Sequence, residues 1–214
     1  SSPGKETGRL SEMLRQAEAE RNDIGKQLHS RRKSSAAKFE KSVNSILAKL
    51  NMKDSSIRVS ITQNTESRRT DGFDDMEMLL INKFSADGMP LAKIASGGEL
   101  SRIMLAMKGT ITVNDPVETM IFDEIDTGIS GETAEMVADI MKAIGKSKQL
   151  IAITHLPQIA SAGEHHILVS KEGDDVRLPQ LNDKERIEEI ARLLGSSMAK
   201  DTAVRHAKAL LKKK

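Results

Sequence analysis

The first fifty residues carry the spacing of apolar positions that is typical of helices. In residues 10–28 an apolar residue recurs about every three or four positions between mostly charged neighbours, which predicts a helix with a narrow apolar stripe. The stripe covers less than about three heptads, so it does not by itself establish a coiled coil. Residues 39–50 carry a wider stripe, which predicts a helix that packs on a globular body. Residues 1–8 contain Pro3 and two glycines without an apolar pattern, so we expect a loose lead-in there.

Beyond residue 51 the pattern changes to short strands separated by helices. Alternation at residues 57–61 and an apolar run at 76–81 predict two strands. Three further runs are short and uniformly apolar, as in a sheet that is buried on both faces; they are residues 119–122, 150–154 and 167–170. Helical patterns lie between and after these runs, at residues 100–108, 132–144, 185–194 and 202–211. Strands that alternate with helices predict an α/β fold with a largely parallel sheet.

Composition excludes several classes of function. The chain has no cysteine, which excludes disulfides, thiolate metal sites and a cysteine nucleophile. Its net charge is only +2, so bulk charge gives no argument for nucleic-acid binding, and an aromatic content of 2% argues against base-stacking surfaces. No apolar run approaches the roughly 20 residues of a membrane span, and no signal peptide is evident. The chain begins with Ser1 rather than Met, which favours a processed or truncated piece.

The first segment with candidate chemistry is Ser96-Gly97-Gly98-Glu99, directly before a predicted helix. Two glycines allow close approach and unusual backbone angles. The amides at a helix N-terminus favour an anion, and Ser96 adds a hydroxyl. A simple glycine turn with a helix cap explains this segment equally well.

The second and third segments each follow a predicted strand. Asp123 and Glu124 come at the end of residues 119–122, and His155 follows residues 150–154. At the carboxyl end of a parallel strand, one carboxylate can hold Mg²⁺ while its neighbour polarises an attacking water, and a histidine can reach a phosphate. The pair could instead cap the next helix, and a lone histidine is more often structural.

In this order, the three segments resemble the second half of an ATP-binding-cassette (ABC) ATPase head. Ser96 to Arg102 is similar to the signature motif and residues 120–124 to the Walker B strand, while the loop at 126–131 is similar to the D-loop and His155 to the switch histidine. Glu99, followed by Leu-Ser-Arg, points away from transporters and towards the SMC-like branch. The stretches at 92–102, 121–131 and 154–160 resemble the SMC-like ATPases of bacterial DNA repair, and the likeness extends over roughly residues 28–211.

The resemblance implies a role for each of these residues. Ser96, Gly97, Gly98 and Glu99 would contact the nucleotide of a second subunit in trans, together with Asp126 of the D-loop. Asp123 would support Mg²⁺, directly or through water. Glu124 would act as general base, and His155 would sense the γ-phosphate. The implied cofactors are ATP and Mg²⁺, and the implied partner is a second copy that closes on two sandwiched ATP molecules.

One part of the family's pattern is absent from the sequence. A complete head needs a P-loop of the form Gly-x-x-x-x-Gly-Lys-Ser/Thr. The only Gly-Lys-Ser here is Gly145-Lys146-Ser147; it lacks the first glycine and follows a predicted helix, so we expect a helix end there. The resemblance then implies an arm at residues 1–38 and the second lobe of the head at 39–214, with the N-terminal Walker A lobe missing.

The resemblance therefore implies half of an ATPase head that acts in recombinational repair of DNA double-strand breaks. It also implies DNA as a partner of the intact protein, no membrane, and a place in the bacterial cytoplasm at the nucleoid. Another SMC-like or RecF-like repair ATPase and a non-enzymatic helical interaction module remain open as alternatives. The basic run at residues 31–33 could touch DNA phosphates, although a solvated helix face explains it more simply.

Overall fold

The structure is a computed structural model that describes residues 3–65, 69–94, 96–112, 115–173, 175–195 and 199–212. Ser1, Ser2 and Ala95, on which small parts of the predictions rest, lie outside these ranges. The chain divides into two compact units, which we call the N-terminal unit (Ser1–Asn44 with Asp54–Lys93) and the C-terminal unit (Ser45–Lys53 with Ile94–Lys214). The predicted division at residue 38 between arm and lobe stays a prediction. Within the described ranges, no helix is long and apolar enough to cross a membrane.

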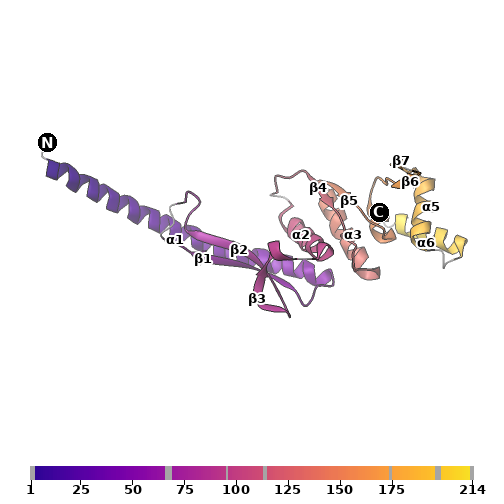
Figure 1. The fold of residues 1–214 in the computed structure, drawn as a ribbon, viewed down its shortest axis with the longest axis horizontal. Coiled ribbons are helices and arrows are strands. Elements are labelled where there is room, and N and C mark those ends of the chain that lie inside the picture. The colour runs from indigo at the N-terminus through magenta and orange to yellow at the C-terminus, as the bar shows by residue number, and fades with distance from the viewer. Residues whose placement is uncertain are drawn as a thin grey trace. The chain divides into compact units, whose positions relative to one another are not determined.

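The chain opens with one long helix, α1 (Pro3–Lys49, 47 residues), drawn from the N-terminus in indigo and purple in Figure 1. The prediction of a loose lead-in at residues 1–8 is wrong for residues 3–8, which are helical. Proline fits the first turn of a helix, where its missing N–H costs nothing, and an isolated glycine weakens a helix by only about 1 kcal/mol. The two helices predicted at 10–28 and 39–50 are parts of this single helix.

A three-stranded antiparallel sheet in the order β1-β2-β3 completes the N-terminal unit. The predicted strands are confirmed as β1 (Ser56–Gln63) and β2 (Asp74–Asn82), which pair from Ser56 with Ile81 to Gln63 with Asp74. Sequence analysis missed β3 (Ser85–Pro90), because its residues show no alternation of apolar and polar positions. A short 3-10 helix, η1 (Leu91–Lys93), follows.

Polar side chains of α1 hold β1 in place. The Asn44 side chain brackets Ile57, since its amide nitrogen donates to the Ile57 carbonyl over 3.0 Å and its oxygen accepts the Ile57 N–H over 2.7 Å. Two residues further along the strand, Glu40 Oε1 accepts the Val59 N–H over 2.6 Å. These bonds satisfy backbone groups of β1 that β2 does not pair.

The far end of the β1–β2 hairpin is held on α1 by a ring and a buried carboxylate. Phe73 lies against Gly25, where a Cβ would overlap its ring, so only glycine fits at this point of the helix. The side chain of Asp74 is buried and contacts His29 Nδ1 over 2.7 Å and Arg32 Nη1 over 3.0 Å. Burial alone would raise the pKa of Asp74, but the hydrogen bonds from His29 and Arg32 outweigh it and lower that pKa below its ordinary value.

The C-terminal unit alternates helices and short strands. Its elements are α2 (Gly97–Ile111), β4 (Thr119–Phe122), α3 (Gly131–Gly145), β5 (Gln149–Ala152), α4 (Pro157–Ala162), β6 (Ser170–Glu172), β7 (Asp175–Arg177), α5 (Asp183–Leu193) and α6 (Lys200–Lys212). The four predicted helices are confirmed as α2, α3, α5 and α6, whereas the short α4 was missed. As predicted, Gly145 ends α3, and the N–H of Lys146 donates back to the carbonyl of Ile144.

The parallel pair of the unit consists of β4 and β5, in register from Thr119 with Gln149 to Phe122 with Ala152. Alternate residues of β4 face opposite sides, and Met120 and Phe122 are buried. On the other face Ile121 is 67% exposed and Ile151 and Ile153 are 46% and 56% exposed. The expectation of a sheet buried on both faces is therefore wrong for this chain, because nothing in its described part covers that face.

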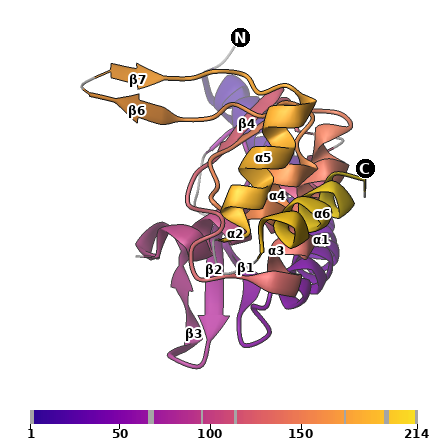
Figure 2. The same cartoon turned by 90° about the vertical axis from the view of Figure 1, so that its right-hand side faces the viewer.

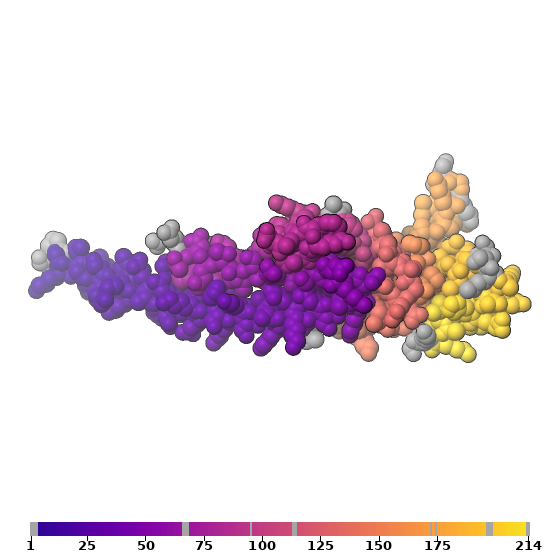
Figure 3. All heavy atoms as spheres, turned by 90° about the horizontal axis from the view of Figure 1, so that it is seen from below, coloured from indigo at the N-terminus to yellow at the C-terminus, as the bar shows by residue number. Residues whose placement is uncertain are grey.

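The last third of the unit is a helical cluster with a ribbon. Ile190 of α5 and Ala207 and Leu210 of α6 form a small core, against which Ala160 of α4 packs. β6 and β7 form an antiparallel ribbon that projects beside α5 and stands out in the space-filling view (Figures 2 and 3). The strand predicted at 167–170 begins only at Ser170, and Ile167 makes a single bridge to Gln180.

Candidate functional site

The structure brings the three predicted segments together within the C-terminal unit. The signature turn, which we define as residues 96–98, begins α2. The carboxylate loop, residues 123–131, leads from β4 to α3, and His155 follows β5 just before α4. Two sets of contacts join them: the signature turn packs on the carboxylate loop, and the carboxylate loop is hydrogen-bonded to the segment around His155.

Ser96 is the N-cap of α2. Its backbone is extended (φ −89°, ψ 113°), and its Oγ accepts the N–H of Glu99 over 3.4 Å, a long hydrogen bond. A helix N-terminus carries unpaired N–H groups and the positive end of the helix dipole. Because Ser96 and Gly97 are exposed, an anion can approach these groups from solvent.

Gly98 is needed because the carboxylate loop lies so close, whereas the atom nearest to Gly97 is the end of a flexible side chain. A Cβ on Gly97 would overlap Oε2 of Glu124, and a Cβ on Gly98 would lie 2.9 Å from Cβ of Thr127 and 3.1 Å from the carbonyl of Glu124. Neither glycine has a positive φ. The close approach expected from the sequence is therefore present, whereas unusual backbone angles are not.

Two residues that sequence analysis quoted without a role strengthen this contact. Ser101 Oγ donates to the Asp123 carbonyl over 2.9 Å, and Arg102 Nη1 donates to the Thr127 carbonyl over 2.8 Å. Burial lowers the pKa of Arg102, and the nearby carboxylate of Glu99 acts in the opposite direction. Both residues lie about one helical turn after the signature turn, and that spacing was the signal that could have identified them.

Asp123 and Glu124 stand exposed at the carboxyl end of β4. Asp123 Oδ1 accepts the N–H of Glu124 over 2.9 Å. Glu124 has a left-handed backbone (φ 55°), which is uncommon for a residue other than glycine. The helix-cap alternative does not hold, because the N-cap of α3 is Ser130 rather than either carboxylate.

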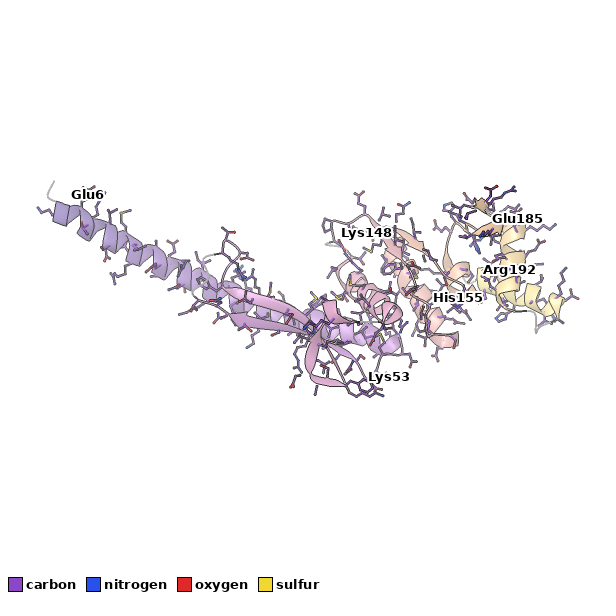
Figure 4. All side chains as sticks on the ribbon, in the orientation of Figure 1. Glu6, Lys53, Lys148, His155, Glu185 and Arg192 are labelled. Carbon is purple, nitrogen blue, oxygen red and sulfur yellow. The ribbon has the colours of Figure 1, made fainter. Side chains whose placement is uncertain are left out.

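Asp126 is the buried centre of the site and connects it to His155. Its Oδ2 accepts from Thr154 Oγ1 over 2.6 Å and from the His155 N–H over 2.8 Å. His155 Nδ1 lies 3.0 Å from the same oxygen, while the side chain is 74% exposed. Figure 4 labels His155 on the ribbon. Thr154 Oγ1 also accepts the Leu156 N–H over 3.1 Å. A proton on Nδ1 that points at Asp126 leaves Nε2 of His155 directed to solvent.

No group of three or more histidine, aspartate or glutamate side chains that could hold a metal ion occurs among the described residues. Mg²⁺ in phosphoryl-transfer sites commonly uses one or two carboxylates together with phosphate oxygens and waters. Asp123, exposed at the end of β4, has the right chemistry for such a single ligand.

Two solved structures share this fold. An SMC head domain with a coiled coil and joint from Pyrococcus yayanosii aligns with a TM-score of 0.58 at 21% identity, covering 90% of this chain and 34% of that chain. An SMC head domain with an extended coiled coil from Pyrococcus furiosus, solved with the C-terminal domain of ScpA, gives 0.54 at 23% identity, covering 81% and 42%. The chain thus has the fold of part of an SMC head domain.

Curated relatives narrow this class to one family, although no protein-family model matches the chain. The DNA repair protein RecN of Treponema pallidum is 39% identical over 197 residues, which are 88% of this chain and 34% of the relative. RecN of Vibrio cholerae is 34% identical over 188 residues, which are 86% and 34%. The chain belongs to the RecN family and spans about a third of the length of these relatives.

Proposed function

We propose that this chain is the signature-and-carboxylate half of an ATPase head that hydrolyses ATP once joined by a lobe with a P-loop. The intact protein would act in recombinational repair of DNA double-strand breaks, in the bacterial cytoplasm at the nucleoid. Membership of the RecN family supports the repair role, and the likeness to SMC heads supports the head architecture.

The observation that carries the proposal is that close contacts and hydrogen bonds join the signature turn, the carboxylate loop and the segment around His155. The signature turn leaves no room for a side chain at Gly98, because Thr127 and backbone carbonyls of the carboxylate loop lie directly against it. The carboxylate loop is joined through Asp126 to the backbone of His155. Phosphoryl transfer depends mainly on positioning and electrostatic stabilisation, and a network of this kind supplies both.

In this proposal each side chain has a separate task. Ser96 and the amides of the signature turn bind the γ-phosphate held by a second subunit, with Glu99 and Asp126 flanking that interface. Asp123 is the ligand of Mg²⁺, which when bound neutralises charge on the phosphates. Glu124 orients the attacking water and takes its proton, and Nε2 of His155 faces the γ-phosphate.

In this proposal the P-loop lobe packs on a surface beside β4. Ile121, Ile151 and Ile153 leave one face of the parallel pair apolar and exposed. Next to it, a hollow of about 330 Å³ lies between α2 and β4, lined in part by Leu100 and Met104. An exposed apolar patch of this kind marks an interface, and burying it under a second lobe would complete the sheet's core. Because the P-loop supplies most phosphate contacts, we expect the present chain alone to bind ATP weakly and not to hydrolyse it.

The decisive experiment compares the two adjacent carboxylates in protein reconstituted with the P-loop lobe. Glu124→Gln should spare ATP binding and remove the base, which costs about 10² to 10⁴ in rate, or roughly 3 to 5 kcal/mol at about 1.4 kcal/mol per decade. Heads of this variant should accumulate as an ATP-locked dimer. Asp123→Asn should weaken Mg-ATP binding and leave the heads monomeric. Light scattering with Mg-ATP measures both dimer fractions.

Ser96→Arg is the control for the trans contact, because it places a bulky cation at the signature turn without touching the P-loop. It should bind ATP normally but fail to dimerise. Equal behaviour of Glu124→Gln and Asp123→Asn would refute the two separate roles. Unchanged ATP-dependent dimerisation of Ser96→Arg would refute the sandwich.

A further inference from the structure

The carboxylate of Glu124 lies against the signature turn of its own chain. A Cβ on Gly97, the first residue of α2, would overlap Oε2 of Glu124, so the carboxylate occupies the space beside the start of the helix. Gly97 and Glu124 are both exposed, and this space is therefore open to solvent. A phosphate that binds the turn would meet the carboxylate at this place. We call this arrangement the Glu124 contact.

The charge of the α2 N-terminus explains why the carboxylate lies there. Within the ranges that the structure describes, the Glu124 side chain makes no ion pair or hydrogen bond with another residue. The first N–H groups of a helix have no partner within the helix, and together with the helix dipole they attract negative charge. The carboxylate therefore takes the place of the anion that the signature turn is proposed to bind.

The backbone of Glu124 is fixed, whereas its side chain is free to rotate. Its N–H donates to Asp123 Oδ1 over 2.9 Å, and its carbonyl accepts the Thr127 N–H over 3.1 Å. Gly98 packs against the same carbonyl. The carboxylate can therefore leave the turn by rotation about side-chain bonds, which in exposed residues takes picoseconds to nanoseconds and needs no change of the loop.

The other carboxylates of the site have different contacts. Asp123 Oδ1 accepts the N–H of Glu124, and buried Asp126 accepts two hydrogen bonds from the segment around His155. The carboxylate of Glu99 lies near the guanidinium of Arg102 and raises its pKa against the effect of burial. Of these four carboxylates, that of Glu124 alone both lies on the signature turn and is free to leave it.

We propose that the Glu124 contact is autoinhibitory. In a head that has not engaged a second subunit, the carboxylate covers the signature turn and repels an approaching phosphate. When the γ-phosphate held by a second subunit binds the turn, the carboxylate is displaced and becomes free to orient the attacking water. The base is thus released only in engaged heads, so hydrolysis follows engagement. This inference rests on the proposed function, because it concerns the same turn and the same base.

Dimerisation with adenylyl imidodiphosphate, an ATP analogue that is not hydrolysed, separates this role of Glu124 from that of a base. Two unit charges about 4 Å apart in water repel enough to change an affinity about fivefold. A dimer closes two signature turns, so Glu124→Gln should raise the dimerisation constant of reconstituted heads about 25-fold. Glu132→Gln is the matched control, because it removes an exposed carboxylate in the first turn of α3. It should leave the constant near that of the unchanged protein.

Hydrogen exchange in the 214-residue chain alone gives a second measurement that loss of a base would not change. Loss of the carboxylate in Glu124→Gln should speed exchange of the first hydrogen-bonded amides of α2 about two- to fivefold, while the last turn of α2 keeps its rate.

Three results would overturn the proposal: no gain in dimerisation of Glu124→Gln with the analogue, an equal gain in Glu132→Gln, or unchanged exchange at the start of α2. ATP hydrolysis is measured separately. A Glu124→Gln head that locks as a dimer only with ATP would refute autoinhibition and keep the base, whereas wild-type hydrolysis with stronger dimerisation on the analogue would refute the base and keep autoinhibition.

Discussion

Replacing Asp126 by alanine tests whether this buried carboxylate holds the site together. Its Oδ2 accepts the Thr154 hydroxyl over 2.6 Å and the His155 N–H over 2.8 Å, both partly buried. A hydrogen bond to a charged group contributes about 1.5–3 kcal/mol, so losing both should cost about 3–6 kcal/mol. The third contact, from the exposed ring of His155, adds little because water can replace it. Asp126→Asn keeps an acceptor oxygen and loses only the charge, so it should cost about 1–2 kcal/mol.

The assay must report on the C-terminal unit alone, because the chain has two compact units. The chain has no tryptophan or tyrosine, which favours hydrogen exchange read by mass spectrometry over fluorescence. Peptides from β4 and β5 followed across a urea series give the midpoint and slope of unfolding for each variant. Equal losses for alanine and asparagine, or a loss below about 1 kcal/mol for alanine, would refute the reasoning. A changed slope would indicate that the variant altered the compactness of the folded or the unfolded state rather than the free energy of unfolding.

Three further predictions concern the rest of the molecule. Gly25→Ala should lower the urea midpoint of the N-terminal unit, because overlap with the Phe73 ring costs about 1–3 kcal/mol, while alanine gains only about 1 kcal/mol of helix propensity over glycine. Gly8→Ala has open space around it and should raise that midpoint. The pKa of Asp74 is lowered in the folded protein, so its contribution to the free energy of unfolding is present above its ordinary pKa of 3.8 and is lost as pH falls through the folded value. Between pH 7 and pH 2.5 the free energy of unfolding of Asp74→Asn should not show that loss. Arg102→Leu should remove about 1 kcal/mol from the carboxylate loop and speed its amide exchange about fivefold, while the amides of α3 keep their rate.

Much of the fold followed from apolar spacing alone. β4 was predicted to the residue, because a short apolar run between polar turns has few alternative structures. The start of α1 was mispredicted, since neither proline in a first turn nor an isolated glycine stops a long helix. β3 could not be found, because its place in the sheet comes from pairing with β2 rather than from its own pattern. The exposure of Ile121 was missed for a similar reason. An apolar run shows that burial of its side chains is favourable, but it does not show that residues of this chain pack over them.

The candidate site was predictable as an order of segments, but not as a set of contacts. The sequence placed Ser96, Glu124 and His155 at the ends of the right elements. It did not show that Asp126 accepts the Thr154 hydroxyl or that Arg102 reaches the carboxylate loop. Such bonds join residues more than twenty positions apart, and local pattern carries no information about them. The roles assigned to these residues stay proposals until the variants are measured.

At Glu124 a backbone conformation that lowers stability coincides with the side chain that is proposed as the base. A residue other than glycine in the left-handed region costs of order 1 kcal/mol, and Glu124 adopts that conformation at φ 55°. Glu124→Gly would relieve this cost and also remove the carboxylate proposed as the base. A selection for thermal resistance alone would therefore favour glycine at this position, and it would yield a more stable protein that lacks the proposed base. Engineering of this head for stability should hold residue 124 unchanged.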